Sequence, residues 1–226
     1  MAIQTNNNYT VAGLYELIFV KNIKHVFTGL IIAVVCATLF FTHYVYVGWR
    51  EKSAQRDFGP LLIQYNMMSR EKDPQWSPLL EEFEKNYKKH SRSALLPYYM
   101  EFKAHILLQQ DKKEEALVCL DRILADVQLS SLSPLLQMER ALILLDSADS
   151  AMRNEGEENL KKLAFDKNNQ FNDSALFYLG RYYWSANKVE QAQNTWQQLV
   201  DEQRDEKLSP SPWLEQAKEY LKVKIV

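Results

Sequence analysis

The sequence is poor in cysteine, and its two cysteines are poorly placed to form a structural site together. Cys36 lies in the most apolar stretch, while Cys119 lies much later, in a pattern typical of helix. An intrachain disulfide is therefore not expected, and the pair lacks the clustered Cys or His ligands of a zinc framework. Two such cysteines fit a cytosolic and a periplasmic protein equally well, so they leave the compartment open.

An excess of basic charge is also missing. The net charge is −2 and the isoelectric point is near 6.1, whereas nucleic-acid-binding proteins normally carry a basic surface. Apolar residues at 46% and charged residues at 25% lie in the range of ordinary folded domains, which argues against wholesale disorder. The sequence indicates a folded protein and does not suggest a nucleic acid as its partner.

Motifs that carry chemistry are absent as well. The four histidines are scattered, no Ser or Cys lies in a nucleophile elbow, and no glycine-rich phosphate loop occurs. The glutamate pairs at 81–82, 114–115 and 157–158 fall near predicted helix starts, where acidic groups suit the helix dipole. We therefore expect no catalytic residues, no cofactor, no metal and no small-molecule substrate.

Charge is missing altogether from one long apolar stretch. No Asp, Glu, Lys or Arg occurs from Val26 to Trp49, and about 20 residues of helix suffice to cross the hydrocarbon core of a membrane. Tyr44, Tyr46 and Trp49 fall where an interfacial aromatic belt would lie. The predicted division is a tail over 1–25, a transmembrane helix over 26–49 and a helical domain over 50–226.

Two other interpretations of this stretch are weaker. A cleaved signal peptide would have a shorter apolar region and a small-residue cleavage site, but this run ends in Tyr-Val-Tyr-Val-Gly-Trp-Arg. A buried helix of a soluble protein rarely runs so long without a charge. Two basic residues precede the span, Lys21 and Lys24, and four follow it by residue 70. Applied simply, the positive-inside rule would place the C-terminal domain in the cytoplasm, but long translocated domains obey this rule poorly. The orientation of the domain therefore stays open.

After this stretch the pattern is helical throughout, with apolar residues recurring at spacings of three and four. The segment Leu179-Gly180-x-x-Tyr183, followed by Ala192 and Trp196, has the spacing of one tetratricopeptide repeat. In such a repeat the small residue of each helix, here Gly180 and Ala192, allows the two helices to approach closely. Helices are also expected over about 51–68, 77–89 and 213–224, with Pro60 as a possible kink or restart in the first.

The same frame recurs twice upstream. Ala104 and Ala116 are again twelve residues apart, and a degenerate copy surrounds Ala141, with its second helix expected to begin near Gly156. The small residues at 104, 141 and 180 are 37 and 39 residues apart, close to the tetratricopeptide length of ~34. The predicted fold class is all-α: a single N-terminal transmembrane helix followed by an α-solenoid of tetratricopeptide-like helical hairpins.

The first helix of each such hairpin lines a concave groove, which gives candidate binding residues. Counted from the small residue of that helix, the candidates for binding protein are Tyr98, Glu101, His105, Met138, Phe177, Arg181 and Trp184. Aromatic side chains mixed with a few charges suit a peptide or a partner surface. Packing in the core between repeats is the alternative for each of them.

The order of parts resembles the YfgM family, the membrane-anchored ancillary subunit of the bacterial Sec translocon. The landmarks are Val47-Gly48-Trp49-Arg50 with Ser53-Ala54, then Glu82-Phe83-Glu84-Lys85-Asn86, and Ser93-Ala94-Leu95 before the first clear hairpin. The resemblance implies a single-pass inner-membrane protein with a periplasmic repeat domain. It also implies contacts with Sec translocon components, a PpiD-like periplasmic chaperone and isomerase, and exported polypeptides. A scaffold subunit of another envelope complex and a cytoplasm-facing repeat adaptor are the alternative functions.

Overall fold

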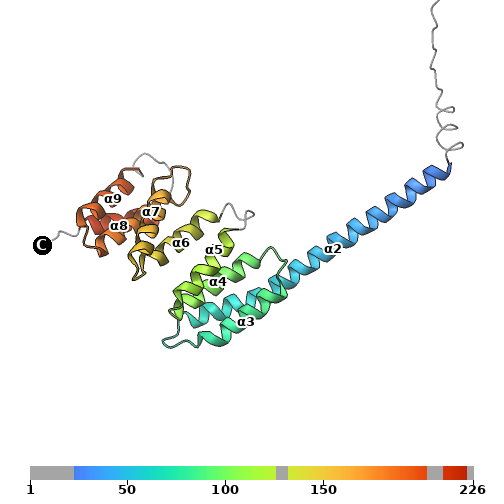
Figure 1. The fold of residues 1–226 in the computed structure, drawn as a ribbon, viewed down its shortest axis with the longest axis horizontal. Coiled ribbons are helices and arrows are strands. Elements are labelled where there is room, and N and C mark those ends of the chain that lie inside the picture. Colours follow the sequence, from blue (N-terminus) through green and yellow to red (C-terminus); the bar gives the residue numbers. More distant parts are fainter. Residues whose placement is uncertain (1–22, 126–131, 203–210, 223–226) are drawn as a thin grey trace, which may run out of the picture.

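The computed structural model describes residues 23–125, 132–202 and 211–222, and every regular element within these ranges is a helix (Figure 1). The helical hairpins follow one another along a stack, from the end of the first long helix to the short last one. Their bounds are α2 Ile23–Met68, α3 Trp76–Lys89, α4 Leu96–Gln109, α5 Lys113–Leu124, α6 Ser133–Leu145, α7 Ser150–Phe165, α8 Asn172–Ser185, α9 Val189–Glu202 and α10 Pro212–Lys222. The predicted all-α solenoid is confirmed.

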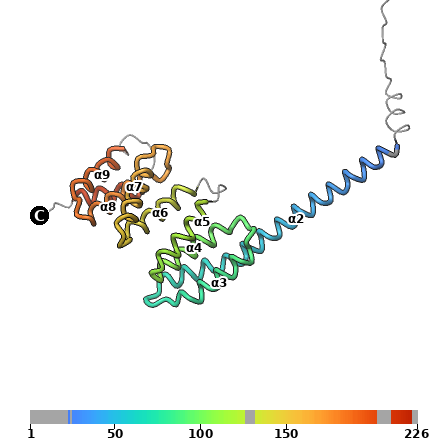
Figure 2. The backbone as a smooth tube through the Cα atoms, in the orientation of Figure 1, coloured from blue at the N-terminus to red at the C-terminus, as the bar shows by residue number. Residues whose placement is uncertain are grey.

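Helix α2 is 46 residues long and its first half projects away from the rest of the molecule (Figures 1 and 2). It is the one helix among the described residues that is long and apolar enough to cross a membrane. The repeat domain covers none of its most apolar stretch, and side chains such as Phe40 are 74% exposed. A soluble core helix would bury such side chains against its neighbours.

No break separates the apolar half of α2 from the half that enters the stack. The helix continues through the 49/50 boundary between the predicted span and the predicted domain, and it contains Pro60. The expected kink or restart therefore does not end the helix. Pro60 lies on the exposed side of α2, where water can satisfy the carbonyl group that loses its partner.

Two carboxylates tie α2 to the loop between α3 and α4. Glu51 accepts hydrogen bonds from the Ser93 hydroxyl at 2.5 Å and from the Ala94 amide at 3.0 Å. Asp57 lies 2.6 Å from Lys89 Nζ and 2.9 Å from Nε2 of the buried His90. The hydrogen bond from Lys89, together with that from His90, lowers the pKa of Asp57 to about 2. The helix that carries the apolar stretch is thus fixed to the first turns of the domain.

The tight turns of the first and third hairpins have the same construction. Asp111 and Asn187 have φ angles of 59° and 58°, and each follows the small residue of its hairpin, Ala104 or Gly180, by seven positions. Asp and Asn tolerate this left-handed conformation better than most residues with a side chain. The turns predicted around 110–113 and 187–188 are confirmed.

The middle hairpin differs from the prediction in its second helix. We expected that helix to begin near Gly156, but α7 begins at Ser150, after Asp149 caps it by accepting a hydrogen bond from Ala151 N at 2.8 Å. Gly156 is instead the small residue of α7, because a Cβ there would lie 2.8 Å from the carbonyl oxygen of Ala141. The two small residues are fifteen rather than twelve positions apart, which explains why the repeat looked degenerate.

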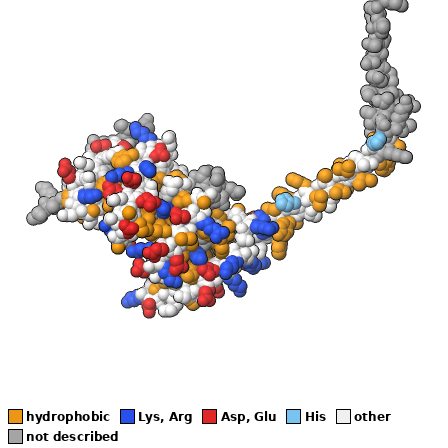
Figure 3. Space-filling view, in the orientation of Figure 1, with side chains coloured by type: hydrophobic (Ala, Val, Ile, Leu, Met, Phe, Trp, Pro, Cys, Tyr) orange, Lys and Arg blue, Asp and Glu red, His pale blue; other side chains and the backbone are white. Residues whose placement is uncertain are grey.

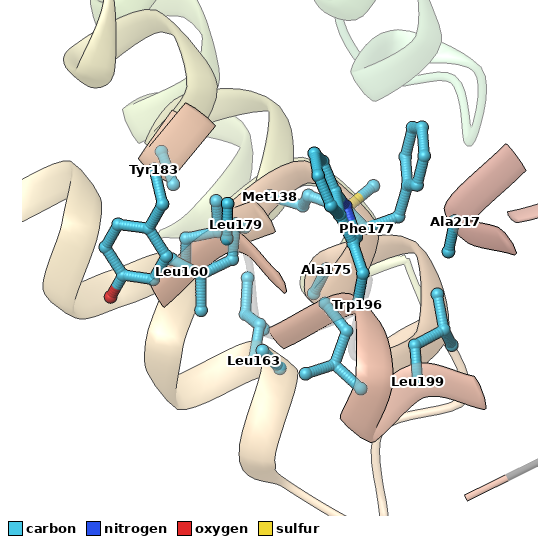
Figure 4. Close-up of a cluster of buried hydrophobic side chains, with 14 residues drawn as sticks. Met138, Leu160, Leu163, Ala175, Phe177, Leu179, Tyr183, Trp196, Leu199 and Ala217 are labelled. Atoms are coloured by element: carbon cyan, nitrogen blue, oxygen red, sulfur yellow. The ribbon is translucent and has the colours of Figure 1, made fainter. Parts of the chain in front are cut away.

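Three buried clusters follow one another along the stack. The first is aromatic and joins α2, α3 and α4, with the Phe58 ring 4.7 Å from Tyr99 and 6.3 Å from Phe83. The second is largely aliphatic and joins α4, α5 and α6 around Leu107 and Leu144. The third contains residues of every helix from α6 to α10, and Trp196 and Phe177 are among its large members. Figure 4 also labels these members of the third cluster: Met138, Leu160, Leu163, Ala175, Leu179, Tyr183, Leu199 and Ala217.

Candidate protein-interaction face

Three of the predicted binding residues lie along one side of α4. Tyr98, Glu101 and His105 are spaced by three and four residues, which places them on the same face of a helix. All three are half-buried, so each packs against neighbours and still presents part of its surface to solvent. This is the arrangement expected of a surface that recognises a partner through a few anchored side chains.

The neighbouring repeat adds a carboxylate that sequence reasoning missed. Glu139 of α6 lies with its Oε2 atom 3.4 Å from Nε2 of His105, and one ligand atom each from Glu101, His105 and Glu139 lies within 4.8 Å of the others. We call these three residues the acidic–His cluster. His105 and Glu139 are 34 positions apart, one repeat length, and this spacing is the signal that could have found the pair.

The cluster shifts the pKa values of its own members. The hydrogen bond to Glu139 raises the pKa of His105, against the opposing effect of burial. Burial, with the nearby Glu139 charge, raises the pKa of Glu101. Both shifts favour the protonated forms, so the cluster holds protons more tightly than isolated side chains do. Its charge therefore depends on pH in the range where histidine titrates.

The cluster also contains the ligand types of a divalent transition metal. One imidazole and two carboxylates form a common donor set, although three ligands are fewer than a closed structural site requires. The prediction of no metal treated the histidines as scattered and overlooked Glu101, which precedes His105 by one helical turn. The same donors could accept hydrogen bonds from a cationic side chain of a partner.

Aromatic rings border the cluster on the side of α2. The ring of Tyr65 lies 6.4 Å from the His105 ring and 5.1 Å from the ring of Phe102, which is itself 5.8 Å from His105. Burial, with Glu139 nearby, raises the pKa of Tyr65. Tyr65 was missed because it lies on the helix that leaves the apolar stretch, outside the recognisable repeats. The face therefore extends from α2 across α4 to α6.

Two of the predicted residues are buried and cannot serve as open contacts. Met138 is 6% exposed within the third cluster. Phe177 is 1% exposed, with its ring 5.1 Å from Trp213 and 6.0 Å from Tyr220 of α10. The last helix thus covers the side of α8 that was expected to line the groove. The expectation of an open surface at these two positions is corrected, and the alternative of core packing holds for them.

The remaining two candidates lie on α8 and do not join the acidic–His cluster. Arg181 is exposed, with its guanidinium carbon 5.9 Å from the centre of the Tyr178 ring. Trp184 is half-buried, with its ring 5.8 Å from that of Trp196. Within the described residues, no hydrogen bond, ion pair or ring contact connects either side chain to Glu101, His105 or Glu139. They form a separate patch near the end of the stack.

The arrangement of paired helices is a tetratricopeptide-like fold. The structure is similar to two crystal structures of nearly identical TPR-like repeats from a putative kinesin light chain of Podosopora anserina, each with a TM-score of 0.53 and 17% sequence identity, over 72% of this chain and 83% of that one. No protein-family model matches the sequence, and no curated protein matches it. Stacked repeats of this kind create extended concave surfaces.

Proposed function

We propose that this protein is a single-pass membrane-anchored adaptor that holds polypeptides close to the bilayer for a protein-export machine. The observation that supports this most strongly is the continuity of α2. One unbroken helix contains both the exposed apolar stretch and part of the first aromatic cluster of the repeat stack. The anchor and the interaction domain therefore move as one unit. In this proposal residues 1–25 are a tail, residues 26–49 are the membrane anchor and residues 50–226 are the interaction domain.

The position of the interaction face follows from this unit. Glu51 and Asp57 fix α2 against the loop between α3 and α4, so the domain keeps a defined direction relative to the apolar helix. Tyr65 lies sixteen residues after Trp49, which corresponds to roughly 24 Å along a helix that rises about 1.5 Å per residue. We infer that the face formed by Tyr65, Tyr98 and the acidic–His cluster stands about one domain radius from the bilayer.

The chemistry of the face suits an extended polypeptide with a basic side chain. Tyr98 and Tyr65 offer aromatic surface, and the carboxylates of Glu101 and Glu139 offer acceptors for a Lys or Arg of the partner. His105 lies close to both carboxylates and competes with such a cation when it is protonated. We propose that this face binds segments of exported polypeptides.

The particular role follows from the resemblance to the YfgM family. It assigns the protein to the bacterial inner membrane, with the repeat domain in the periplasm beside the Sec translocon and a PpiD-like isomerase. Protease digestion in spheroplasts of the native host tests the orientation. Digestion of the domain from outside supports export assistance, whereas protection of an intact domain contradicts it and leaves a cytoplasm-facing adaptor.

The translocon contact is tested by affinity capture of the full-length protein from detergent-solubilised membranes. The expected result is recovery of the channel-forming translocon subunit with the wild-type protein. As a control, the apolar stretch is replaced by an unrelated span of equal length. Loss of the translocon subunit from the control places the contact in the anchor. If neither protein recovers a translocon or chaperone component, the export role is wrong and a scaffold of another envelope complex remains.

A further inference from the structure

The point where α2 meets the loop between α3 and α4 contains a cleft that the interaction face does not use. Its volume is about 520 Å³. The part that matters here is formed by three residues of α2, the last residue of α3 and two residues of the following loop: Tyr46, Trp49, Arg50, Lys89, Ser91 and Arg92. We call this the junction cleft. It lies beside the last turns of the apolar stretch, on the side where the domain begins.

The surroundings of the junction cleft are strongly basic. Residues 50–57 and 88–92 contain six Lys and Arg side chains and two carboxylates, and Lys and Arg side chains gather where α2 joins the domain (Figure 3). Both carboxylates are engaged inside the protein. Glu51 pairs with Arg50 at 2.8 Å and accepts hydrogen bonds from Ser93 and Ala94. Asp57 binds Lys89 and His90 and lies 3.6 Å from Arg56. They neutralise Arg50 and Lys89 of the cleft, and no ion pair among the described residues joins either of them to Lys52, Lys88 or Arg92.

Three of these cations, Lys52, Lys88 and Arg92, have no acceptor among the described residues, and two of them lie in or beside the cleft. Arg92, in the cleft, and Lys52, beside it on α2, are exposed and make no hydrogen bond or ion pair to any residue that the structure describes. The other wall is aromatic, since Tyr46 is 55% and Trp49 is 68% exposed. An unpaired guanidinium beside an exposed indole and phenol is a combination that fits a ligand with an anionic head and an apolar body.

We propose that the junction cleft binds the phosphate-bearing headgroup of an anionic phospholipid. This inference rests on the proposed function in one respect, namely that α2 crosses a membrane. Tyr46 and Trp49 then lie at the level of the headgroups, and lipid phosphates are concentrated at the mouth of the cleft. Arg92 contacts the phosphate, Lys52 adds long-range attraction, and the aromatic side chains pack against the glycerol and upper acyl region.

Such a contact would orient the whole domain. A helix alone is free to rotate about the bilayer normal and to tilt, but a headgroup held between α2 and the loop after α3 fixes the side of the domain that faces the lipid. Because Glu51 and Asp57 already join these two elements, the bound lipid would complete a three-way contact. The interaction face would then point in a constant direction relative to the bilayer.

The test uses the full-length protein and begins with flotation on vesicles of phosphatidylcholine. The wild type, the double variant Lys52→Gln with Arg92→Gln, and the control Lys72→Gln with Lys167→Gln are compared. Lys72 and Lys167 are exposed and without a hydrogen bond or ion pair among the described residues, so the control removes the same charge elsewhere. All three proteins are expected to float. Failure of the wild type to float contradicts the membrane anchor itself, and with it this proposal.

Binding is then measured in neutral detergent by the shifts of the Ser91 and Arg92 backbone amides in NMR spectra. Short-chain phosphatidylglycerol, short-chain phosphatidylcholine and inorganic phosphate are titrated separately. Saturable shifts with phosphatidylglycerol, weakened roughly tenfold or more in the Lys52/Arg92 variant and unchanged in the control, are expected from the loss of two basic groups. Equal affinity for inorganic phosphate shows a general anion site, and equal weakening in both variants shows a diffuse charge effect. Either result, or absent shifts in a protein that floats, overturns the lipid site.

Discussion

The indole of Trp196 lies directly on Gly180. A Cβ added at position 180 would fall 2.3 Å from the indole nitrogen, and that nitrogen donates a hydrogen bond to the main-chain carbonyl of Phe177 at 3.2 Å. Trp196 is completely buried, and a rigid ring of this size cannot move aside within a close-packed core. Gly180 is therefore required by the approach of α9 to α8.

Replacing Gly180 with Ala is expected to destabilise the domain by about 1–3 kcal/mol or more, because overpacking displaces Trp196. The midpoint of thermal unfolding of the full-length protein in detergent is the measurement, and a fall of about 2–4 °C per kcal/mol is expected for a domain of this size. Gly48→Ala is the matched control, since a Cβ there meets nothing within 4 Å. Equal midpoints for the two variants would show that the close approach is not required.

The pairing of Asp57 with Lys89 and His90 predicts a pH-dependent stability. The pKa of Asp57 in the folded state, about 2, lies below its ordinary value of about 3.9. Its contribution to stability is therefore present above the ordinary value and is lost as the pH falls toward 2. Asp57→Asn is expected to lower the free energy of unfolding by about 1–2 kcal/mol at neutral pH, with a difference from wild type that shrinks in acid.

Urea unfolding at a series of pH values measures this difference. Asp73→Asn is the control, because Asp73 is exposed in the segment between α2 and α3 and makes no ion pair with a described residue. Its stability is expected to follow the wild type at every pH. A constant gap between Asp57→Asn and wild type down to about pH 2 would mean that the Asp57 pKa is not lowered in the fold.

The acidic–His cluster predicts that His105 titrates above its ordinary pKa of about 6.5 because of Glu139. In Glu139→Gln the attraction is lost while burial remains, so the pKa of His105 is expected to fall. Since the folded pKa is raised in the wild type, the stabilising contribution of His105 is complete below the ordinary value and is lost as the pH rises through the folded value. An NMR titration of the His105 ring protons in both proteins gives the two midpoints.

Glu114→Gln serves as the control for this titration, since Glu114 is exposed on α5 and has no hydrogen bond or ion pair to a described residue. An unchanged His105 midpoint in Glu139→Gln would show that the two side chains do not interact in solution. The binding proposal would then lose the carboxylate that it assigns to α6.

Tyr99 connects α4 to α2 through one buried hydrogen bond. Its hydroxyl donates to the carbonyl of Ala54 at 3.0 Å, and burial raises its pKa to about 12. Tyr99→Phe is expected to cost about 1 kcal/mol in urea unfolding, whereas Tyr98→Phe, at a half-buried position, costs less. Equal effects of the two changes would show that the hydrogen bond does not contribute.

The repeats could be predicted from the sequence because close helix packing leaves a periodic trace. Gly180 and Ala192 mark it in the third hairpin, and Ala104 and Ala116 mark it in the first. The second helix of the middle hairpin was placed wrongly because three extra residues move Gly156 out of the twelve-residue frame. Nothing in the composition of 146–149 predicts that the turn there becomes a capped loop, except Asp149 before the first turn of α7.

The interaction face could be predicted only where it lies on a single helix. Tyr98, Glu101 and His105 share one side of α4, so periodicity alone placed them together. Glu139 and Tyr65 reach the same face from α6 and α2, and their positions depend on how the repeats stack in three dimensions. Phe177 precedes Gly180 by three positions, as Glu101 precedes Ala104, so the same periodic rule selected both. However, α10 covers Phe177. The sequence of α8 alone does not indicate where the terminal helix packs.

The claim that the face of α4 and α6 binds polypeptide is tested most directly by photocrosslinking in the membranes of living cells. A photoreactive phenylalanine derivative replaces Tyr98 in one full-length variant and Val118 in the other. Val118 is 67% exposed on α5, the other helix of the same hairpin. The account predicts crosslinks to exported polypeptides from position 98 and few from position 118. Equal crosslinking at both positions, or none at position 98, would contradict it.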